Sequence, residues 1–160
     1  MTPTSALVGL FAGRPSPAFS DRLTDWLAED GPNMFRLLLI FFAGGCGCLL
    51  RYGVAGWAQR FTNSSFPTGT LAVNVIGCLA LGFLATFFTG PVFLRTDYRL
   101  AILVGLLGGF TTFSTFAYET IMLTDDGQFT LAALNLLLSN ALGLVAAWLG
   151  TRLTLVIYGT

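Results

Sequence analysis

The sequence predicts an all-α integral membrane protein with four transmembrane helices in each subunit. Of its 160 residues, 54% are hydrophobic and only 10% are charged, whereas soluble domains carry about 25% charged residues. A hydrocarbon core of about 30 Å requires about 20 mostly apolar residues for each helix. The stretches that meet this requirement are residues 34–57, 69–90, 98–123 and 129–157. We therefore expect a multi-pass protein in the lipid bilayer of the cell membrane.

Charges are rare within these stretches. The first contains only Arg36 and Arg51, the second contains none, and the fourth is uncharged until Arg152. The connectors QRFTNSSFPT, PVFLRTD and TDDGQ are polar and short. Connectors of this length make consecutive helices antiparallel. Residues 34–160 are thus predicted to form one four-helix domain.

Residues 1–33 differ in composition and form an N-terminal arm. Within it, residues 21–29 have an amphipathic pattern, with Leu23, Trp26 and Leu27 on one side and acidic residues on the other. One interpretation is an interfacial helix, and the other is a loosely ordered arm. The acidic face favours the second, because anionic lipid would repel it.

The distribution of arginines favours cytoplasmic termini. An even number of spans puts both termini on one side, and the positive-inside rule assigns the Arg-rich side to the cytoplasm. That side would hold Arg14, Arg22, Arg36, Arg95, Arg99 and Arg152, and the other side holds Arg60.

Composition excludes several classes of function. The net charge is zero, which gives no electrostatic basis for nucleic-acid binding. The chain has no His and no Lys, so the commonest general base and a Ser–Lys pair are both missing. Cys46, Cys48 and Cys78 lie in apolar stretches without a C-x-x-C pair, which argues against zinc or a disulfide framework. We expect no enzymatic activity.

The third stretch contains GLLGGFTTFSTFAYE at residues 105–119. Two glycines followed by hydroxyl side chains are poor helix formers, which predicts a broken third helix in mid-membrane. Such a break is tolerated where it is buried in protein or lines a polar cavity, and it exposes backbone groups that can bind ions. Phe113 and Phe116 would project on one face, and their positive ring edges could face an anion.

Neutral polar residues occur at helical spacing in the second and fourth stretches. Thr70 and Asn74 are four residues apart, as are Asn135 and Ser139. Either they form hydrogen bonds between helices, or they line a track of neutral donors. Glu119, near the end of the third stretch, is the only carboxylate that a proton-coupled transporter could use within a span. The pattern favours a passive route for a small anion.

Three segments resemble the Fluc (CrcB-like) fluoride channel family: GGCGCLLRY at 44–52, FPTGTLAVNVIGC at 66–78, and GLLGGFTTFSTFAYE. The resemblance covers residues 36–155. It implies an antiparallel, dual-topology homodimer with two pores, which exports toxic fluoride from the cytoplasm. It also implies a structural Na⁺ at the dimer centre, held by backbone carbonyls.

Individual roles follow from the resemblance alone. It assigns the Na⁺ carbonyls to Gly108 and Thr111, and a vestibule or structural role to Arg51 and Glu119. The residues that it places in the fluoride pore are Asn74, Phe113, Phe116, Thr70 and Ser139.

Two features depart from the family pattern: the 33-residue arm is extra, and Gly143 and Ala147 stand where further hydroxyls are expected. The Arg asymmetry would fit a second, oppositely oriented homologue as partner, although we expect a homodimer. Two other functions stay open. A small dimeric exporter is one alternative, although it would need a Glu early in the first span. A non-transporting membrane subunit is the other.

Overall fold

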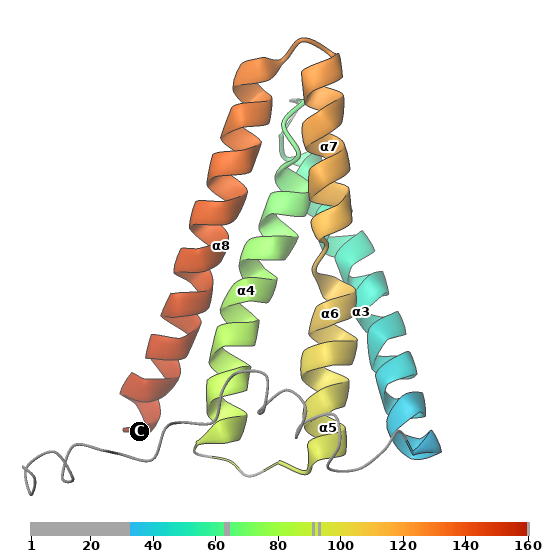
Figure 1. The fold of residues 1–160 in the computed structure, drawn as a ribbon, viewed down its shortest axis with the longest axis vertical. Helices are drawn as coiled ribbons and strands as arrows, with labels where there is room; N and C mark the ends of the chain where they lie inside the picture. Colours follow the sequence, from blue (N-terminus) through green and yellow to red (C-terminus); the bar gives the residue numbers. More distant parts are fainter. Residues whose placement is uncertain (1–32, 63–64, 91, 93, 160) are drawn as a thin grey trace, which may run out of the picture. The chain divides into compact units, whose positions relative to one another are not determined.

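The computed structural model describes residues 33–159 except 63–64, 91 and 93, so the expected arm and its amphipathic helix lie outside the described residues. The first span is α3 (Met34–Arg60) and the second is α4 (Thr68–Thr89). The third contains α5 (Thr96–Leu100), the π-helical segment η1 (Ala101–Leu107), α6 (Gly108–Phe110) and α7 (Phe113–Asp125). The fourth is α8 (Phe129–Tyr158), as Figure 1 shows.

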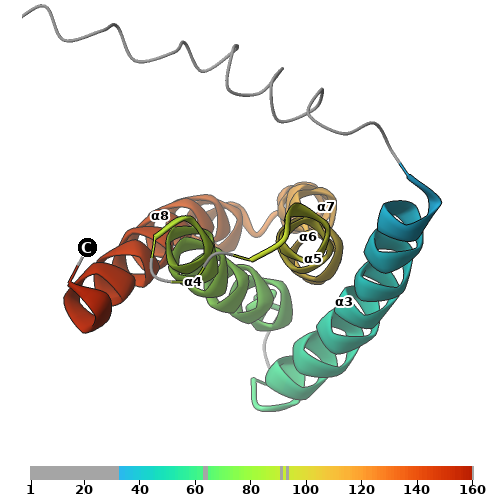
Figure 2. The same ribbon diagram turned by 90° about the horizontal axis from the view of Figure 1, so that it is seen from below.

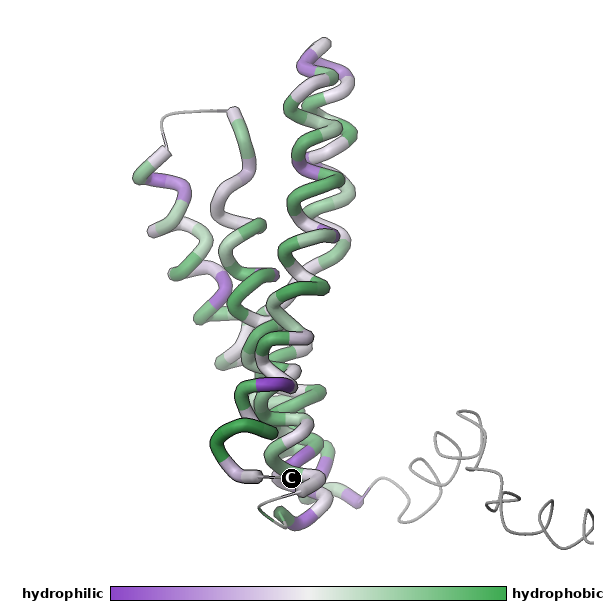
Figure 3. Tube along the Cα trace, turned by 90° about the vertical axis from the view of Figure 1, so that its left-hand side faces the viewer, coloured by the Kyte–Doolittle hydropathy of each residue, from purple (hydrophilic) through white to green (hydrophobic). Residues whose placement is uncertain are grey.

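Each of the four spans is long and apolar enough to cross a membrane. The third counts as one span from Thr96 to Asp125. Figure 3 shows hydrophobic colour over most of the length of these segments. The prediction of an all-α protein with four membrane spans is therefore confirmed, and the observed helices extend a few residues beyond some of the predicted ends.

Helices α4 and α8 form the most extensive contact between elements, and Figure 2 shows them side by side. Two glycines allow their backbones to approach closely. A Cβ atom on Gly82 would lie 2.1 Å from the Ala147 carbonyl oxygen, and one on Gly150 would lie 2.2 Å from that of Leu79. Close approach through small residues is how helices associate in lipid, where the hydrophobic effect does not drive them together.

Helix α3 packs against η1 and α6 through a second pair of glycines. A Cβ atom on Gly47 would lie 2.2 Å from the Leu106 carbonyl oxygen, and one on Gly109 would lie 2.5 Å from that of Gly44. The contact holds α6 at a fixed depth beside α3. Only 6% of the apolar window of α3 is buried, so most of this helix is uncovered in a single chain.

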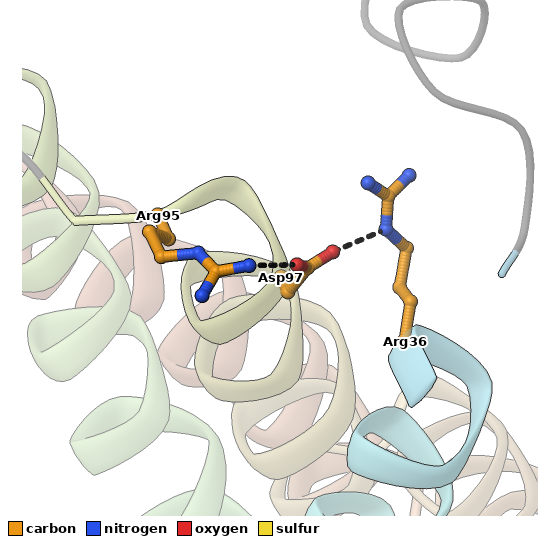
Figure 4. A network of polar contacts seen from close by, with 3 residues as sticks. All are labelled: Arg36, Arg95 and Asp97. Atoms are coloured by element: carbon orange, nitrogen blue, oxygen red, sulfur yellow. Dashed lines mark hydrogen bonds and ion pairs between the residues drawn. The ribbon is translucent and has the colours of Figure 1, made fainter. Parts of the chain in front are cut away.

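An ion pair joins the beginnings of the first and third spans (Figure 4). Arg36 Nε lies 2.8 Å from Asp97 Oδ1, and both side chains are almost fully buried. Arg95 lies 3.5 Å from the other carboxylate oxygen and is itself exposed. A buried charge is tolerated when it is paired and hydrogen-bonded, so Asp97 fixes the first turn of the third span against α3.

We predict that Gly150→Ala lowers the free energy of unfolding by about 1–3 kcal/mol, because the added methyl group forces α4 and α8 apart. Gly143→Ala is the matched control on the same helix, since its Cβ atom would meet only the Cys78 sulfur, at 3.6 Å. Denaturation of both variants in detergent micelles measures the difference. Equal stability of the two variants would contradict the account of close packing.

Candidate functional site

The helical backbone stops at two residues halfway along the third span. Thr111 has φ −84° and ψ 159°, and Thr112 has φ −152° and ψ 119°, so both are extended. We call this pair the interruption. Figure 1 shows it as the non-helical link between α6 and α7. Backbone groups released here must find partners, because hydrocarbon offers none.

Asn74 on α4 supplies the partners for Thr112. Its Oδ1 atom accepts a hydrogen bond from the Thr112 amide at 2.9 Å, and its Nδ2 atom donates to the Thr112 carbonyl at 2.9 Å. One side-chain amide therefore satisfies both backbone groups of a buried, extended residue. The predicted pore residue Asn74 holds the interruption in place.

Hydrogen bonds to side chains at the interruption leave two carbonyls without their helical donors. In an unbroken helix the Thr112 amide would donate to Gly108, four residues earlier, but here it donates to Asn74. The Thr115 amide would donate to Thr111, but it donates to Thr112 Oγ1 at 3.2 Å and so caps α7. The carbonyls of Gly108 and Thr111, the two predicted Na⁺ ligands, are therefore among those that lose a helical donor at the interruption. Carbonyl oxygens of this kind suit a small, hard cation.

Arg51 from α3 approaches one of these carbonyls. Its Nη1 atom donates to the Thr111 oxygen at 3.4 Å, and its Nη2 atom donates to Cys48 Sγ at 3.6 Å. The guanidinium therefore lies beside the interruption, and its vestibule or structural role stays a prediction. Among the described contacts of the interruption, Arg51 is the one residue with a formal positive charge.

Gly77 gives the interruption room against α4. A Cβ atom at this position would lie 2.2 Å from Thr111 Cγ2. Neither Gly77 nor Thr112 was assigned a role from sequence. A Thr three residues before Thr115, at the start of a helix, is typical of an N-cap and could have identified Thr112. The packing of Gly77 depends on the rotation of two helices, for which the sequence has no signal.

A hollow of about 300 Å³ lies on one side of the interruption, and we call it the Phe113 hollow. The rings of Phe113 and Phe116 adjoin there, with centroids 5.4 Å apart and planes tilted by 57°. Phe116 is buried, whereas Phe113 is 77% exposed. The predicted site residues that line this hollow are Asn74, Gly108, Thr111, Phe113, Phe116 and Ser139.

A second hollow, of about 340 Å³, is lined by Arg51, Thr70, Thr112 and Thr115, among others. We call it the Arg51 hollow. Thr112 lines both hollows, so the two adjoin at the interruption. Thr70 thus lies apart from the other predicted pore residues, although it shares a face of α4 with Asn74.

The Thr70 hydroxyl contacts Glu119, which lies toward the end of the third span. It donates to Glu119 Oε1 at 2.8 Å. The other carboxylate oxygen of Glu119 is buried and has no hydrogen-bond partner within the described part of the chain. Glu119 lines a third hollow, of about 220 Å³, together with Gln59 and Asp126. The three hollows therefore follow one another through Thr112 and the Thr70–Glu119 contact.

Comparison with known proteins identifies the family. A family model described as CrcB-like protein, Camphor Resistance (CrcB), matches residues 38–151. The chain belongs to the CrcB-like family. A protein of Geobacter metallireducens named fluoride-specific ion channel FluC is 43% identical over 117 residues, which cover 73% of this chain and 94% of that protein. The FluC proteins of Geobacter sulfurreducens and Nitratidesulfovibrio vulgaris are 45% and 44% identical, with the same coverage.

Membership of the CrcB-like family confirms the resemblance inferred from the three sequence segments. The relatives are named as ion channels, which also confirms the expectation that this chain is not an enzyme. The family match begins at residue 38, so the interruption, Asn74 and all three hollows belong to the part of the chain that matches.

Proposed function

We propose that this chain is a fluoride-selective, passive ion channel that exports fluoride from the cytoplasm. The observation that carries the proposal is the interruption held by Asn74, with two hollows that adjoin at Thr112 in mid-span. Backbone that is not helical is tolerated at this depth where it is buried or lines a polar cavity. The name of the relatives, fluoride-specific ion channel, supports fluoride as the ion.

Neutral groups in the Phe113 hollow suit a small, strongly hydrated anion. The positive edges of Phe113 and Phe116 can face an anion. An amide nitrogen has two hydrogens, and Asn74 gives one to Thr112, so the second is available to an anion. Ser139 adds a hydroxyl to the same hollow. These groups can replace water around fluoride without a full charge.

The described contacts also favour release of the ion. Thr70 already donates to Glu119, and Ser139 already donates to Asn135 Oδ1 at 3.2 Å. A fluoride ion must compete with these internal acceptors for the Thr70 and Ser139 hydrogens, which weakens its binding at both hydroxyls. Conduction requires binding that is favourable enough for entry but weak enough for exit.

Arg51 and Glu119 take opposite roles in this proposal. The Arg51 guanidinium lines its hollow and draws anions toward the interruption by its charge. Glu119 lies beyond Thr70, where its carboxylate accepts the Thr70 hydroxyl. An anion that passes Thr70 must displace this contact, so Glu119 acts at the mouth of the route.

A second subunit is needed to complete the route. Phe113, Ser114 and Thr115 are all exposed at the start of α7, in the middle of the span. Hydroxyls at this depth are costly against lipid and normally face protein or water. Helix α3 is also largely uncovered. We propose that a second copy of the chain covers these surfaces as a homodimer.

The two copies are proposed to be antiparallel. Inverting a subunit in the membrane exchanges its cytoplasmic and external ends, but residues in the middle of the bilayer stay at the same depth. The interruption is halfway along Thr96–Asp125, so two inverted copies would present their interruptions at the same depth. The carbonyls of Gly108 and Thr111 from both copies could then hold one Na⁺ as a structural ion.

We predict rapid fluoride efflux and negligible chloride efflux from liposomes that contain the purified protein, measured with ion-selective electrodes. Phe113→Ile and Asn74→Ala should each lower fluoride efflux at least about tenfold, which corresponds to about 1.4 kcal/mol in the barrier. Phe113→Ile loses the ring edge, and Asn74→Ala loses the amide and the hold on Thr112. Phe129→Ile is the matched control, because Phe129 is exposed at the start of α8 and lines none of the three hollows.

No efflux of either anion from folded dimers would contradict the channel and favour a non-transporting subunit. Normal fluoride efflux in both Phe113→Ile and Asn74→Ala would leave the channel in place and overturn these site assignments.

Sodium binding is predicted to stabilise the protein, since a ligand that binds only the folded state raises its stability by mass action. The melting temperature in NaCl should exceed that in N-methylglucamine chloride of equal concentration. Asn74→Leu should reduce this difference, because loss of both hydrogen bonds to Thr112 leaves the backbone that carries the Gly108 and Thr111 carbonyls without its support from α4. Equal melting temperatures of the unmodified protein in the two salts would contradict the Na⁺ site.

A further inference from the structure

Asn135 on α8 is the most buried amide among the described residues, with 1% of its surface exposed. It lies between two helices. Its Nδ2 atom donates to Thr120 Oγ1 on α7 at 2.9 Å, and its Oδ1 atom accepts from Ser139 at 3.2 Å. Asn140 on the same helix is exposed and donates to the carbonyl of Leu136 in its own helix. Only the first of these two amides joins α8 to α7.

The hydrogen bonds run in one direction through four residues. Thr120 donates its hydroxyl hydrogen to the Phe116 carbonyl at 2.8 Å. A hydroxyl has one hydrogen, so Thr120 can only accept from Asn135. Asn135 must then turn its NH₂ group to Thr120 and its oxygen to Ser139, and Ser139 must donate. We call this series the Ser139–Phe116 relay.

Both ends of the relay lie in the proposed fluoride route. Phe116 and Ser139 line the Phe113 hollow, whereas Asn135 and Thr120 do not. Helix α7 packs on α8 less extensively than α4 does. The buried hydrogen bond between Asn135 on α8 and Thr120 on α7 therefore contributes strongly to the position of the helical turn that contains Phe116.

The geometry points to Asn135 as a positioning residue for fluoride passage, acting with Thr120 on the Phe116 ring and the Ser139 hydroxyl. It holds the Phe116 turn at a fixed depth against α8. It also directs the Ser139 hydrogen away from the hollow until an anion competes for it. This inference rests on the proposed channel function.

A purely structural hydrogen bond between helices would give a different result. It would change the amount of folded dimer but not the behaviour of each dimer that folds. A positioning role changes the fluoride efflux of each folded dimer and its ratio to chloride efflux. It also requires Asn135 and Thr120 to act as one unit, so that their effects are not additive.

The test measures fluoride and chloride efflux per folded dimer, after the folded fraction is determined by size-exclusion chromatography. Asn135→Leu and Thr120→Val each remove one polar member with little change in volume, and each should lower fluoride efflux about tenfold. Fluoride efflux of the double variant should be no lower than that of the less active single variant. Thr120→Ser, which keeps the hydroxyl, should restore efflux to near the unmodified value.

Thr124→Val is the matched control. The Thr124 hydroxyl lies one turn after Thr120 and donates to the Thr120 carbonyl within its own helix, so its loss should leave efflux unchanged. Unchanged efflux per dimer in Asn135→Leu, additive effects in the double variant, or equal losses in Thr120→Ser and Thr120→Val would each overturn the inference. If Asn135→Leu does not fold, the Thr120→Val and Thr120→Ser pair decides alone.

The controls separate this inference from the proposed function. Fluoride efflux from the unmodified protein and Thr124→Val, together with normal efflux from the relay variants, would overturn only the role of Asn135. Absence of fluoride efflux from the unmodified protein would overturn both proposals.

Discussion

Two hydrogen bonds between the Asn74 side chain and the backbone of Thr112 set the geometry of the third span. Without them, a buried amide and a buried carbonyl would have no partner in a medium that supplies none. With them, the chain can stay extended for two residues and start a new helix at Phe113. This break in the helix places Phe113 and the hydroxyls that follow it at the start of α7, and it releases the Gly108 carbonyl.

The rest of the molecule supports this arrangement through small residues and buried pairs. Gly77 leaves room for Thr111, and Gly109 lets α6 lie against α3. The Arg36–Asp97 pair fixes one end of the third span, while the Ser139–Phe116 relay ties the other half to α8. The polar groups of the ion pair and of the relay each have a partner, which is the condition for keeping them in a membrane.

The sequence predicted the spans well because hydrocarbon thickness and composition alone determine them. Six of the predicted site residues line the Phe113 hollow, and four of them, Gly108, Thr111, Phe113 and Phe116, fall within one short segment. The sequence could not predict that Asn74 binds Thr112, that Thr70 lies in a different hollow, or that Asn135 reaches α7. These contacts depend on how far each helix is rotated and shifted, and residue spacing within one helix does not specify its neighbours. The π-helical stretch Ala101–Leu107 likewise had no signal in its apolar sequence.

The central claim is that an anion route passes the interruption held by Asn74. The most direct measurement is solid-state NMR of the protein in lipid, with the side-chain amide of Asn74 and the rings of Phe113 and Phe116 labelled, as fluoride is added. The account predicts shifts at these three side chains with fluoride and none with the same concentration of chloride. No shift at any of them, or equal shifts with both anions, would contradict it.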